Sequence, residues 1–172
     1  MNLRREIDEI DALILERLQR EGRVTQSALS SSVGRSVPAI SARIRRLEED
    51  GIILGFHAAL DPKRLRHDVT AFVSVSLRRR QDVPRFLESL RGIREVLEIH
   101  AIADEKTHLL KLRTENTSRL ERLLRMMEKQ MGIERISASI VLSTHRETQR
   151  IPICPDLRPS RPPLPVNVAA GE

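Results

Sequence analysis

Aromatic residues are scarce in this 172-residue sequence, which contains three Phe, no Tyr and no Trp. Domains that bind single-stranded nucleic acid stack the bases on aromatic side chains, so the composition argues against an interface of that kind. Cys154 is the only cysteine, which excludes an intramolecular disulfide, a cysteine-based zinc site and an iron–sulfur cluster. No apolar run approaches the roughly 20 residues that span a bilayer, and no signal-peptide core follows Met1. We therefore expect a protein of the reducing cytoplasm.

Positive charge is present but unevenly distributed. The sequence has 30 Lys and Arg against 24 Asp and Glu, a formal net charge of +6. Residues 1–51 are neutral overall, yet residues 22–47 contain five arginines and no acid. A local basic surface attracts polyanions even on a neutral domain, because salt screens charges beyond about 8–10 Å. On charge alone, a solvated arginine-rich helix face explains the pattern equally well.

Three short helices are predicted in the first fifty residues. Each begins at a residue that favours N-caps and ends at a glycine: Asp8 to Gly22, Thr25 to Gly34, and Ser36 to Gly51. Apolar residues recur within each helix at the spacing of one buried face. Three helices joined by tight turns predict a helix-turn-helix module over residues 1–51.

The third of these helices carries the candidate DNA-contacting residues. Its apolar stripe of Ile40, Ile44 and Leu47 leaves three small residues and Arg45 on the opposite face, and Arg43 and Arg46 flank that face. Small side chains permit close approach to base edges in the major groove, and arginine reaches phosphate or guanine. The predicted DNA-binding residues are Ser36, Pro38, Ser41, Ala42, Arg43, Arg45 and Arg46. The alternative is a three-helix bundle used only for packing or dimerisation.

Residues 69–149 alternate between strand and helix patterns. The predicted order is β-α-β-β-α-β, which is the ferredoxin-like arrangement: Val69–Leu77, Asp82–Leu90, Glu95–Ile102, Leu109–Arg113, a helix from Thr117 to Gly132, and Ile136–Leu142. Two helices on one face leave the other sheet face bare, with Ser74, Ser76, Glu98 and His100 among apolar residues. We expect a second copy of the chain to cover that face, giving a homodimer at least.

Two further segments flank this domain. Residues 52–68 are predicted to form a linker strand and a turn. Residues 150–172 contain six of the nine prolines and are predicted to form a disordered tail. A polyproline ligand for a partner protein is the less favoured interpretation of the tail.

Several short segments, taken together with their order and spacing along the chain, form a recognisable sequence pattern. They are Ile14-Leu15, Leu18-Gln19, Val33-Gly34, Ser41–Glu48, Gly51-Ile52-Ile53, Gly55-Phe56, Glu95–Glu98 and Ser139–Thr144. The set resembles the leucine-responsive/asparagine-regulator (Lrp/AsnC) family of bacterial and archaeal transcription regulators over roughly residues 5–148. The resemblance implies an α+β protein with a winged-helix-like DNA-binding domain and a ferredoxin-like sensing domain. It also implies duplex DNA and an amino acid or related small molecule as partners, and dimers that assemble into rings.

The resemblance places the effector near the loop between the second and third strands of the ferredoxin-like domain. The candidate effector-binding residues are His100, Ala103, Asp104, Glu105, Lys106, Thr107 and His108. Relatives often have a glycine followed by acidic and aromatic residues in this loop, whereas Asp104 stands at the glycine position here. Lys106 and Glu105 are placed to pair with the carboxylate and amine of a ligand, or are ordinary loop charges. The identity of the effector is open.

An enzyme on the same scaffold is the alternative from another functional class. Some proteins that resemble this family are sirohaem decarboxylases, and His100 or His108 with Arg113 is the arrangement to consider here. The basic third helix argues against that alternative, because an enzyme does not need a base-reading face. The sequence has no nucleophile elbow, phosphate-binding glycine loop or adjacent histidine pair, so we predict no catalytic residues, metal or cofactor. A third possibility is a ligand-binding module whose helix-turn-helix serves only oligomerisation.

Overall fold

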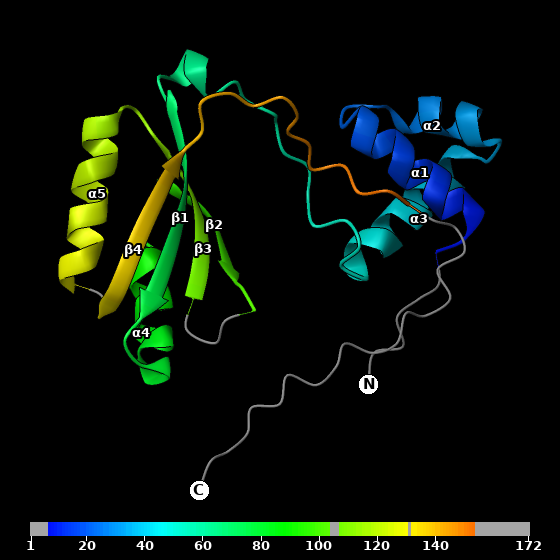
Figure 1. The fold of residues 1–172 in the computed structure, drawn as a ribbon. Coiled ribbons are helices and arrows are strands. Elements are labelled where there is room, and N and C mark those ends of the chain that lie inside the picture. Colours follow the sequence, from blue (N-terminus) through cyan, green and yellow to red (C-terminus); the bar gives the residue numbers. More distant parts are fainter. Residues whose placement is uncertain (1–6, 104–106, 131, 154–172) are drawn as a thin grey trace, which may run out of the picture. The chain divides into compact units, whose positions relative to one another are not determined.

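The computed structural model describes residues 7–103, 107–130 and 132–153. It divides into two compact units (Figure 1). The first, called the N-terminal unit, combines residues up to 58 with those from 148 onward, and the second, called the sheet unit, contains residues 59–147. No helix within the described ranges is long and apolar enough to cross a membrane.

The N-terminal unit consists of three helices, α1 (Glu9–Arg20), α2 (Gln26–Val33) and α3 (Val37–Glu49). The predicted caps operate at the first two: the side chain of Asp8 accepts the N–H of Asp11 at 2.7 Å, and that of Thr25 accepts the N–H of Ala28 at 3.2 Å. Ser36 occupies the N-cap of α3, but its hydroxyl makes no capping hydrogen bond. The helices enclose a core of Ile14, Leu15, Leu29, Ile40 and Leu47.

Glycine shapes the ends of two of these helices. Gly34 adopts a left-handed conformation (φ +69°) after α2, and Gly51 does the same (φ +68°) after α3. L-residues with a Cβ seldom adopt this conformation, so both glycines meet a backbone requirement of the turn. The helix-turn-helix predicted from the sequence is confirmed, although α1 ends at Arg20 rather than at Gly22.

The sheet unit is an antiparallel four-stranded sheet with two helices. Its order along the chain is β1 (Val69–Leu77), α4 (Val83–Leu90), β2 (Val96–Ala101), β3 (Thr107–Thr114), α5 (Thr117–Gln130) and β4 (Ile133–Ile140), with short 3-10 turns at Lys63–Leu65 and Arg80–Asp82. The strands lie in the order β2-β3-β1-β4 (Figure 1). This is the predicted ferredoxin-like arrangement, with β1 and β3 in the centre.

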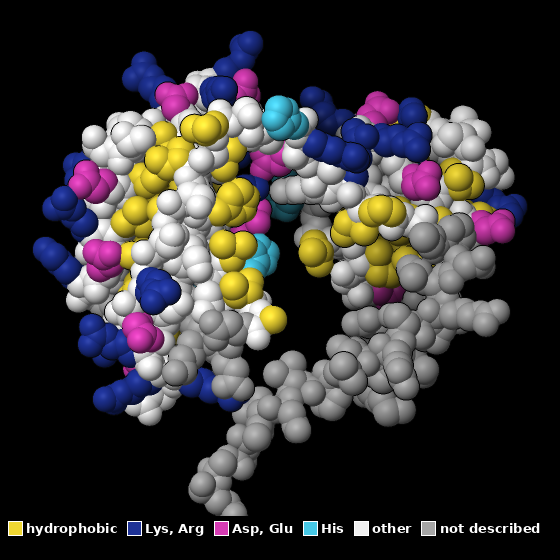
Figure 2. All heavy atoms as spheres, viewed as in Figure 1, with side chains coloured by type: hydrophobic (Ala, Val, Ile, Leu, Met, Phe, Trp, Pro, Cys, Tyr) yellow, Lys and Arg dark blue, Asp and Glu magenta, His cyan; other side chains and the backbone are white. Residues whose placement is uncertain are grey.

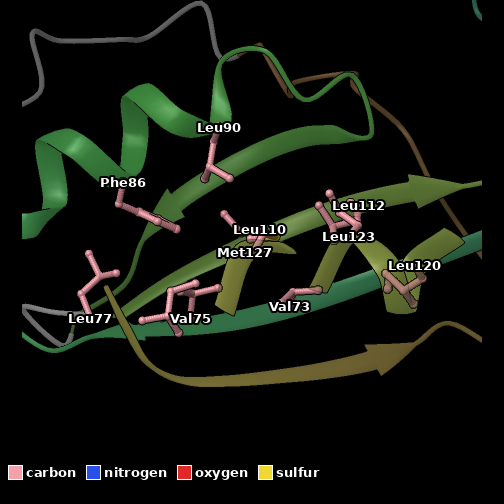
Figure 3. Packing of buried hydrophobic residues seen from close by; sticks show 12 residues of the cluster. Val73, Val75, Leu77, Phe86, Leu90, Leu110, Leu112, Leu120, Leu123 and Met127 are labelled. Carbon is pink, nitrogen blue, oxygen red and sulfur yellow. The ribbon is translucent and has the colours of Figure 1, made fainter. Parts of the chain in front are cut away.

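Both helices of the sheet unit pack on one face of the sheet. Alternate residues of β1, from Ala71 to Leu77, are fully buried beneath them. Phe86 and Leu90 from α4, with Leu123 and Met127 from α5, complete this core (Figure 3). The other sheet face, called the open face, carries half-buried or exposed side chains, and Figure 2 shows hydrophobic side chains among the charged ones on the surface of this unit.

The predicted linker strand is absent from the described structure. Residues 52–60 form no strand, and Leu54, Phe56 and Leu60 in this segment are exposed. A strand is stabilised by a hydrogen-bonded neighbour, and among the described residues none pairs with this segment. Alternating apolar residues are therefore not enough to make a strand here.

The start of the predicted tail has a defined structure. Residues 150–153 form no helix or strand, but Ile151 hydrogen-bonds to Gln19 on α1 and Ile153 packs against the cluster of the three helices. The rest of the predicted tail, residues 154–172, lies outside the described residues. The last strand also differs from prediction, because β4 begins at Ile133 and ends at Ile140.

Candidate nucleic-acid interface and ligand loop

The outer side of α3 presents an open hollow. Its lining residues come from one helix face: Pro38, Ser41, Ala42, Arg45, Arg46 and Glu49. Ile40 and Leu47, on the opposite side of α3, are fully buried. The buried stripe thus orients the helix so that small side chains and two arginines share an accessible surface, as the helical periodicity predicted.

The two arginines in this hollow differ in their surroundings. The Nε of Arg45 donates to Glu49 at 2.8 Å, with the Arg45 side chain 79% exposed. Arg46 is exposed and makes no ion pair among the residues that the structure describes. An exposed pair one helical turn apart contributes only about 0.3–0.5 kcal/mol, so a phosphate competes easily for Arg45. Sequence reasoning left Glu49 out of this surface, although its i+4 spacing from Arg45 was the available signal.

Arg43 lies elsewhere, between α3 and α1. Its Nη1 donates to Asp8 at 2.6 Å and to Asp11 at 2.7 Å, and the side chain of Asp11 is 1% exposed. Burial alone would raise the pKa of Asp8, but hydrogen bonds from the Asp11 N–H and from Arg43 hold that pKa below its ordinary value. The sequence placed Arg43 at the flank of the outer face and among the DNA-binding residues, whereas in the structure its guanidinium joins α3 to α1.

A second hollow adjoins the first on the N-terminal unit. It shares Ser41 and Arg45 with the first hollow, and its other lining residues include Val24, Gln26 and Phe56. Phe56 is one of only three phenylalanines in the chain and is 49% exposed. Gln26 and Phe56 were not among the predicted site residues, although Gly55-Phe56 belongs to the segments that carry the family resemblance.

The candidate effector residues are distributed over different environments. Asp104, Glu105 and Lys106 lie outside the described residues, and Ala103 is an exposed residue before them. Thr107 and His108 are buried at the start of β3 (7% and 4% exposed), where the Thr107 hydroxyl lies 3.1 Å from that of Ser76. Of the candidate effector residues that the structure describes, Thr107 and His108 are therefore buried, and His100 and Ala103 lie on the surface.

His100 and His108 do not lie on the same side of the sheet. The His108 ring packs beneath the helices, 5.4 Å from the ring of Phe86 at an interplanar angle of 59°. His100 pairs in register with Leu109, the residue after His108, and its exposed side chain lies 3.1 Å from Glu98. The two histidines therefore do not form a common site, and in the described residues no group of three His, Cys, Asp or Glu side chains is arranged to hold a metal ion.

A charged network occupies the open face of the sheet. Lys111 on β3 donates to Glu98 on β2 at 3.1 Å and also to Glu147, which accepts from Arg113 at 3.2 Å. Glu147, with Glu98, raises the pKa of Lys111 although burial lowers it, and Lys111 in turn holds the pKa of Glu147 low. Sequence reasoning identified Glu98 on this face but missed Glu147, which follows the last strand.

Comparison with known protein families gives a match in each unit. Residues 7–53 match the family model described as winged helix-turn-helix DNA-binding. Residues 70–151 match the model described as the Lrp/AsnC ligand binding domain. The two matches together extend over both units.

Similar proteins of known role match along almost their whole length. The chain is 31% identical over 147 residues to the HTH-type transcriptional regulator FL11 of Pyrococcus horikoshii, covering 86% of this chain and 97% of that protein. It is also 31% identical over 152 residues to the leucine-responsive regulatory protein of Escherichia coli, covering 87% and 93%.

Solved structures agree with these matches. The transcriptional regulator NMB0573 of Neisseria meningitidis in complex with L-Met aligns with a TM-score of 0.79 at 28% identity, covering 84% of this chain and 96% of that one. The AsnC protein of E. coli aligns with a TM-score of 0.78 at 26% identity, covering 84% and 97%.

Proposed function

This chain belongs to the Lrp/AsnC family of transcriptional regulators, and from that membership we propose which of its residues read DNA and which sense a ligand. It is a DNA-binding regulator with an N-terminal helix-turn-helix and a C-terminal amino-acid-responsive domain. A regulator of this kind acts where the chromosome lies, so we propose the cytoplasm as its compartment.

Helix α3 enters the major groove with its outer face. The observation that carries this proposal is the shared surface of Pro38, Ser41, Ala42, Arg45 and Arg46. The small residues approach base edges, and the two arginines contact guanine or phosphate. Ser36 and the free N–H groups at the start of α3 contact a phosphate, since the hydroxyl of Ser36 is not used as a cap. Arg43 supports this surface from behind by fixing α3 to α1.

The regulator works as a homodimer, and dimers assemble further into rings. The open face of the sheet supports the first step, because exposed Phe72 lies beside Lys111 on this face and a second copy would remove its ring from water. A helix-turn-helix dimer presents two reading helices, which matches an operator with two half-sites.

The effector is an amino acid or a related small molecule, and it binds at the loop from Ala103 to Thr107. NMB0573 was solved with L-Met, which supports this ligand class. An effector changes DNA binding only if it binds one assembly or conformational state better than another. Thr107 and His108 are buried, so among the described residues of this set Ala103 and His100 are the ones accessible to a ligand.

The sirohaem decarboxylase alternative is not favoured. The relatives named above are transcriptional regulators. His100 and His108 also face opposite sides of the sheet, so they do not supply one tetrapyrrole site with Arg113. We propose that the chain has no enzymatic activity, and mixing it with sirohaem tests this, since a tetrapyrrole absorbance that remains with the protein after gel filtration would contradict it.

The test of DNA reading compares the upstream region of the protein's own gene with a shuffled duplex of equal length. We expect tighter binding to the upstream fragment at moderate salt, and a steep loss of affinity as salt rises because phosphate contacts release counterions. Equal affinity for the two duplexes would contradict sequence-specific reading.

The test of ligand sensing is a thermal-shift screen with the twenty amino acids. A ligand specific for the folded state raises the apparent Tm. We expect one amino acid, or a small group of similar ones, to raise it and to alter the operator affinity. A screen in which no amino acid changes either quantity would contradict the proposed effector class.

A further inference from the structure

The chain returns to the N-terminal unit after completing the sheet unit. Gln19 on α1 and Ile151 exchange two hydrogen bonds: the Gln19 amide donates to the Ile151 carbonyl at 3.0 Å and accepts the Ile151 N–H at 2.6 Å. These residues are 132 positions apart in the sequence. A side-chain amide carries one donor group and one acceptor, so it satisfies both backbone groups of one extended residue at once.

The same segment has an apolar anchor. Ile153 is half-buried and packs against the cluster formed by the three helices, whereas the side chain of Ile151 is 72% exposed. Pro152 lies between them and holds the residue before it in an extended conformation. Recognition therefore combines the backbone of Ile151 with the side chain of Ile153, two residues apart.

The other end of the segment is fixed within the sheet unit. Glu147 is the last residue of that unit and bonds to Lys111 and Arg113 on the open face. Only residues 148–150 separate Glu147 from the residue that Gln19 holds. The two units are thus joined by two covalent connections, one after residue 58 and one after residue 147.

We propose that residues 148–153 are a second tether, which docks on α1 and completes the DNA-reading unit. The occupant of the α1 surface around Gln19 is this segment of the same chain. A ligand or a second copy bound on the open face would change the Lys111–Glu147 pair. Such a change displaces the segment and weakens or strengthens its hydrogen bonds to Gln19 on α1. Because α1 is joined to α3 through Asp11 and Arg43, the change reaches the reading helix by a route separate from the linker after residue 58.

Two truncations of the chain test the docking. A chain that ends after Ile153 keeps the tether, and a chain that ends after Glu147 lacks it. We expect the first to match the full chain in the hydrogen-exchange protection of α1 and in operator affinity. The second loses protection and binds the operator more weakly. Equal behaviour of the two truncations would overturn the proposal.

Point substitutions in the full chain keep the test decisive if the shorter truncation fails to fold. Gln19→Ala and Ile151→Pro each remove part of the exchanged pair, and we expect each to raise the unfolding equilibrium constant of the N-terminal unit about fivefold to tenfold. The double variant should lose little more than either single one, because they share one interaction. Strictly additive losses would overturn the docking. Gln149→Ala, in the same segment but outside the pair, is the matched control and should leave the constant unchanged.

The coupling is tested by Glu147→Gln. This change weakens the ion pairs with Lys111 and Arg113, and we expect it to alter operator affinity about fivefold in the wild-type background. In the Gln19→Ala background it should have almost no effect, because the tether no longer holds α1. An equal effect in both backgrounds would overturn the coupling. The stability measurements above do not depend on DNA, so a failure of the tether is distinguishable from a failure of the DNA-binding proposal.

Discussion

The guanidinium of Arg43 on α3 lies 2.7 Å from the carboxylate of Asp11 on α1, and the Asp11 side chain is almost entirely removed from solvent. A buried carboxylate is costly unless it is paired, so this contact fixes the reading helix against the helix behind it. Three arginines occur within four residues of α3, and this one has a structural role that the other two do not share.

Replacement of Arg43 is expected to destabilise the protein. Arg43→Ala removes the guanidinium that pairs with the buried carboxylate of Asp11, and we expect a loss of about 2 kcal/mol in the free energy of unfolding. Urea denaturation measures it. The control is Arg45→Ala, which removes an exposed pair and should cost less than about 0.5 kcal/mol. Similar losses in the two variants would contradict the structural role of Arg43.

Replacement of Arg45 is expected to affect DNA rather than stability. Arg45→Ala removes a cation from the proposed reading face and should weaken operator binding about tenfold. If Arg45 contacts a phosphate, the slope of log affinity against log salt should also fall by about 1. Arg20→Ala on α1 and Arg80→Ala in the sheet unit are the controls, and titrations should show little change for either. An equal loss for Arg80→Ala would refute the proposed orientation of α3.

The Asp8 carboxylate gives a pH dependence of stability. Its pKa is lower in the folded chain than its ordinary value of 3.8, so its contribution is present above that value and disappears as the pH falls through the lower, folded pKa. Asp8 is half exposed, and solvent screening limits the contribution to about 0.5 kcal/mol. Asp8→Asn retains a capping side chain but not the charge. We expect it to be less stable than wild type at pH 7, with a difference that shrinks as the pH is lowered below 3.8 in parallel urea titrations; a constant difference would contradict the assignment.

The two histidines near the ligand loop are expected to respond differently to substitution. His108→Ala removes a ring packed against Phe86 in the core and should cost about 2 kcal/mol. His100→Ala changes an exposed residue and should stay within about 0.5 kcal/mol. Thermal unfolding of both variants is the measurement. A stability change of the same size in each would mean that His108 is not a core residue.

Regular periodicity explains most of what could be predicted. The three helices and their order followed from caps, glycines and apolar spacing, and β1 was predicted with its observed ends, Val69 and Leu77. The outer face of α3 followed from the same spacing. The alternation of β3 could also have predicted the burial of His108, because residues two apart in a strand point to the same face and Leu110 is buried.

Contacts between distant residues explain what could not be predicted. The direction of the Arg43 side chain depends on Asp8 and Asp11, which belong to another helix. Residues 52–60 have a strand-like pattern, but a strand also requires a neighbour. The proline-rich composition after residue 150 indicated disorder, and no local signal pointed to the pairing of Ile151 with Gln19.

The order of the segments in the N-terminal unit has a consequence during synthesis. The three helices emerge from the ribosome first, but Ile153 is translated about a hundred residues after Gly51. The nascent unit therefore waits for the whole sheet unit before its contact with Ile153 can form. For the same reason, a chimera that exchanges DNA specificity between two such regulators must carry two separate pieces of the gene, one for the helices and one for the returning segment.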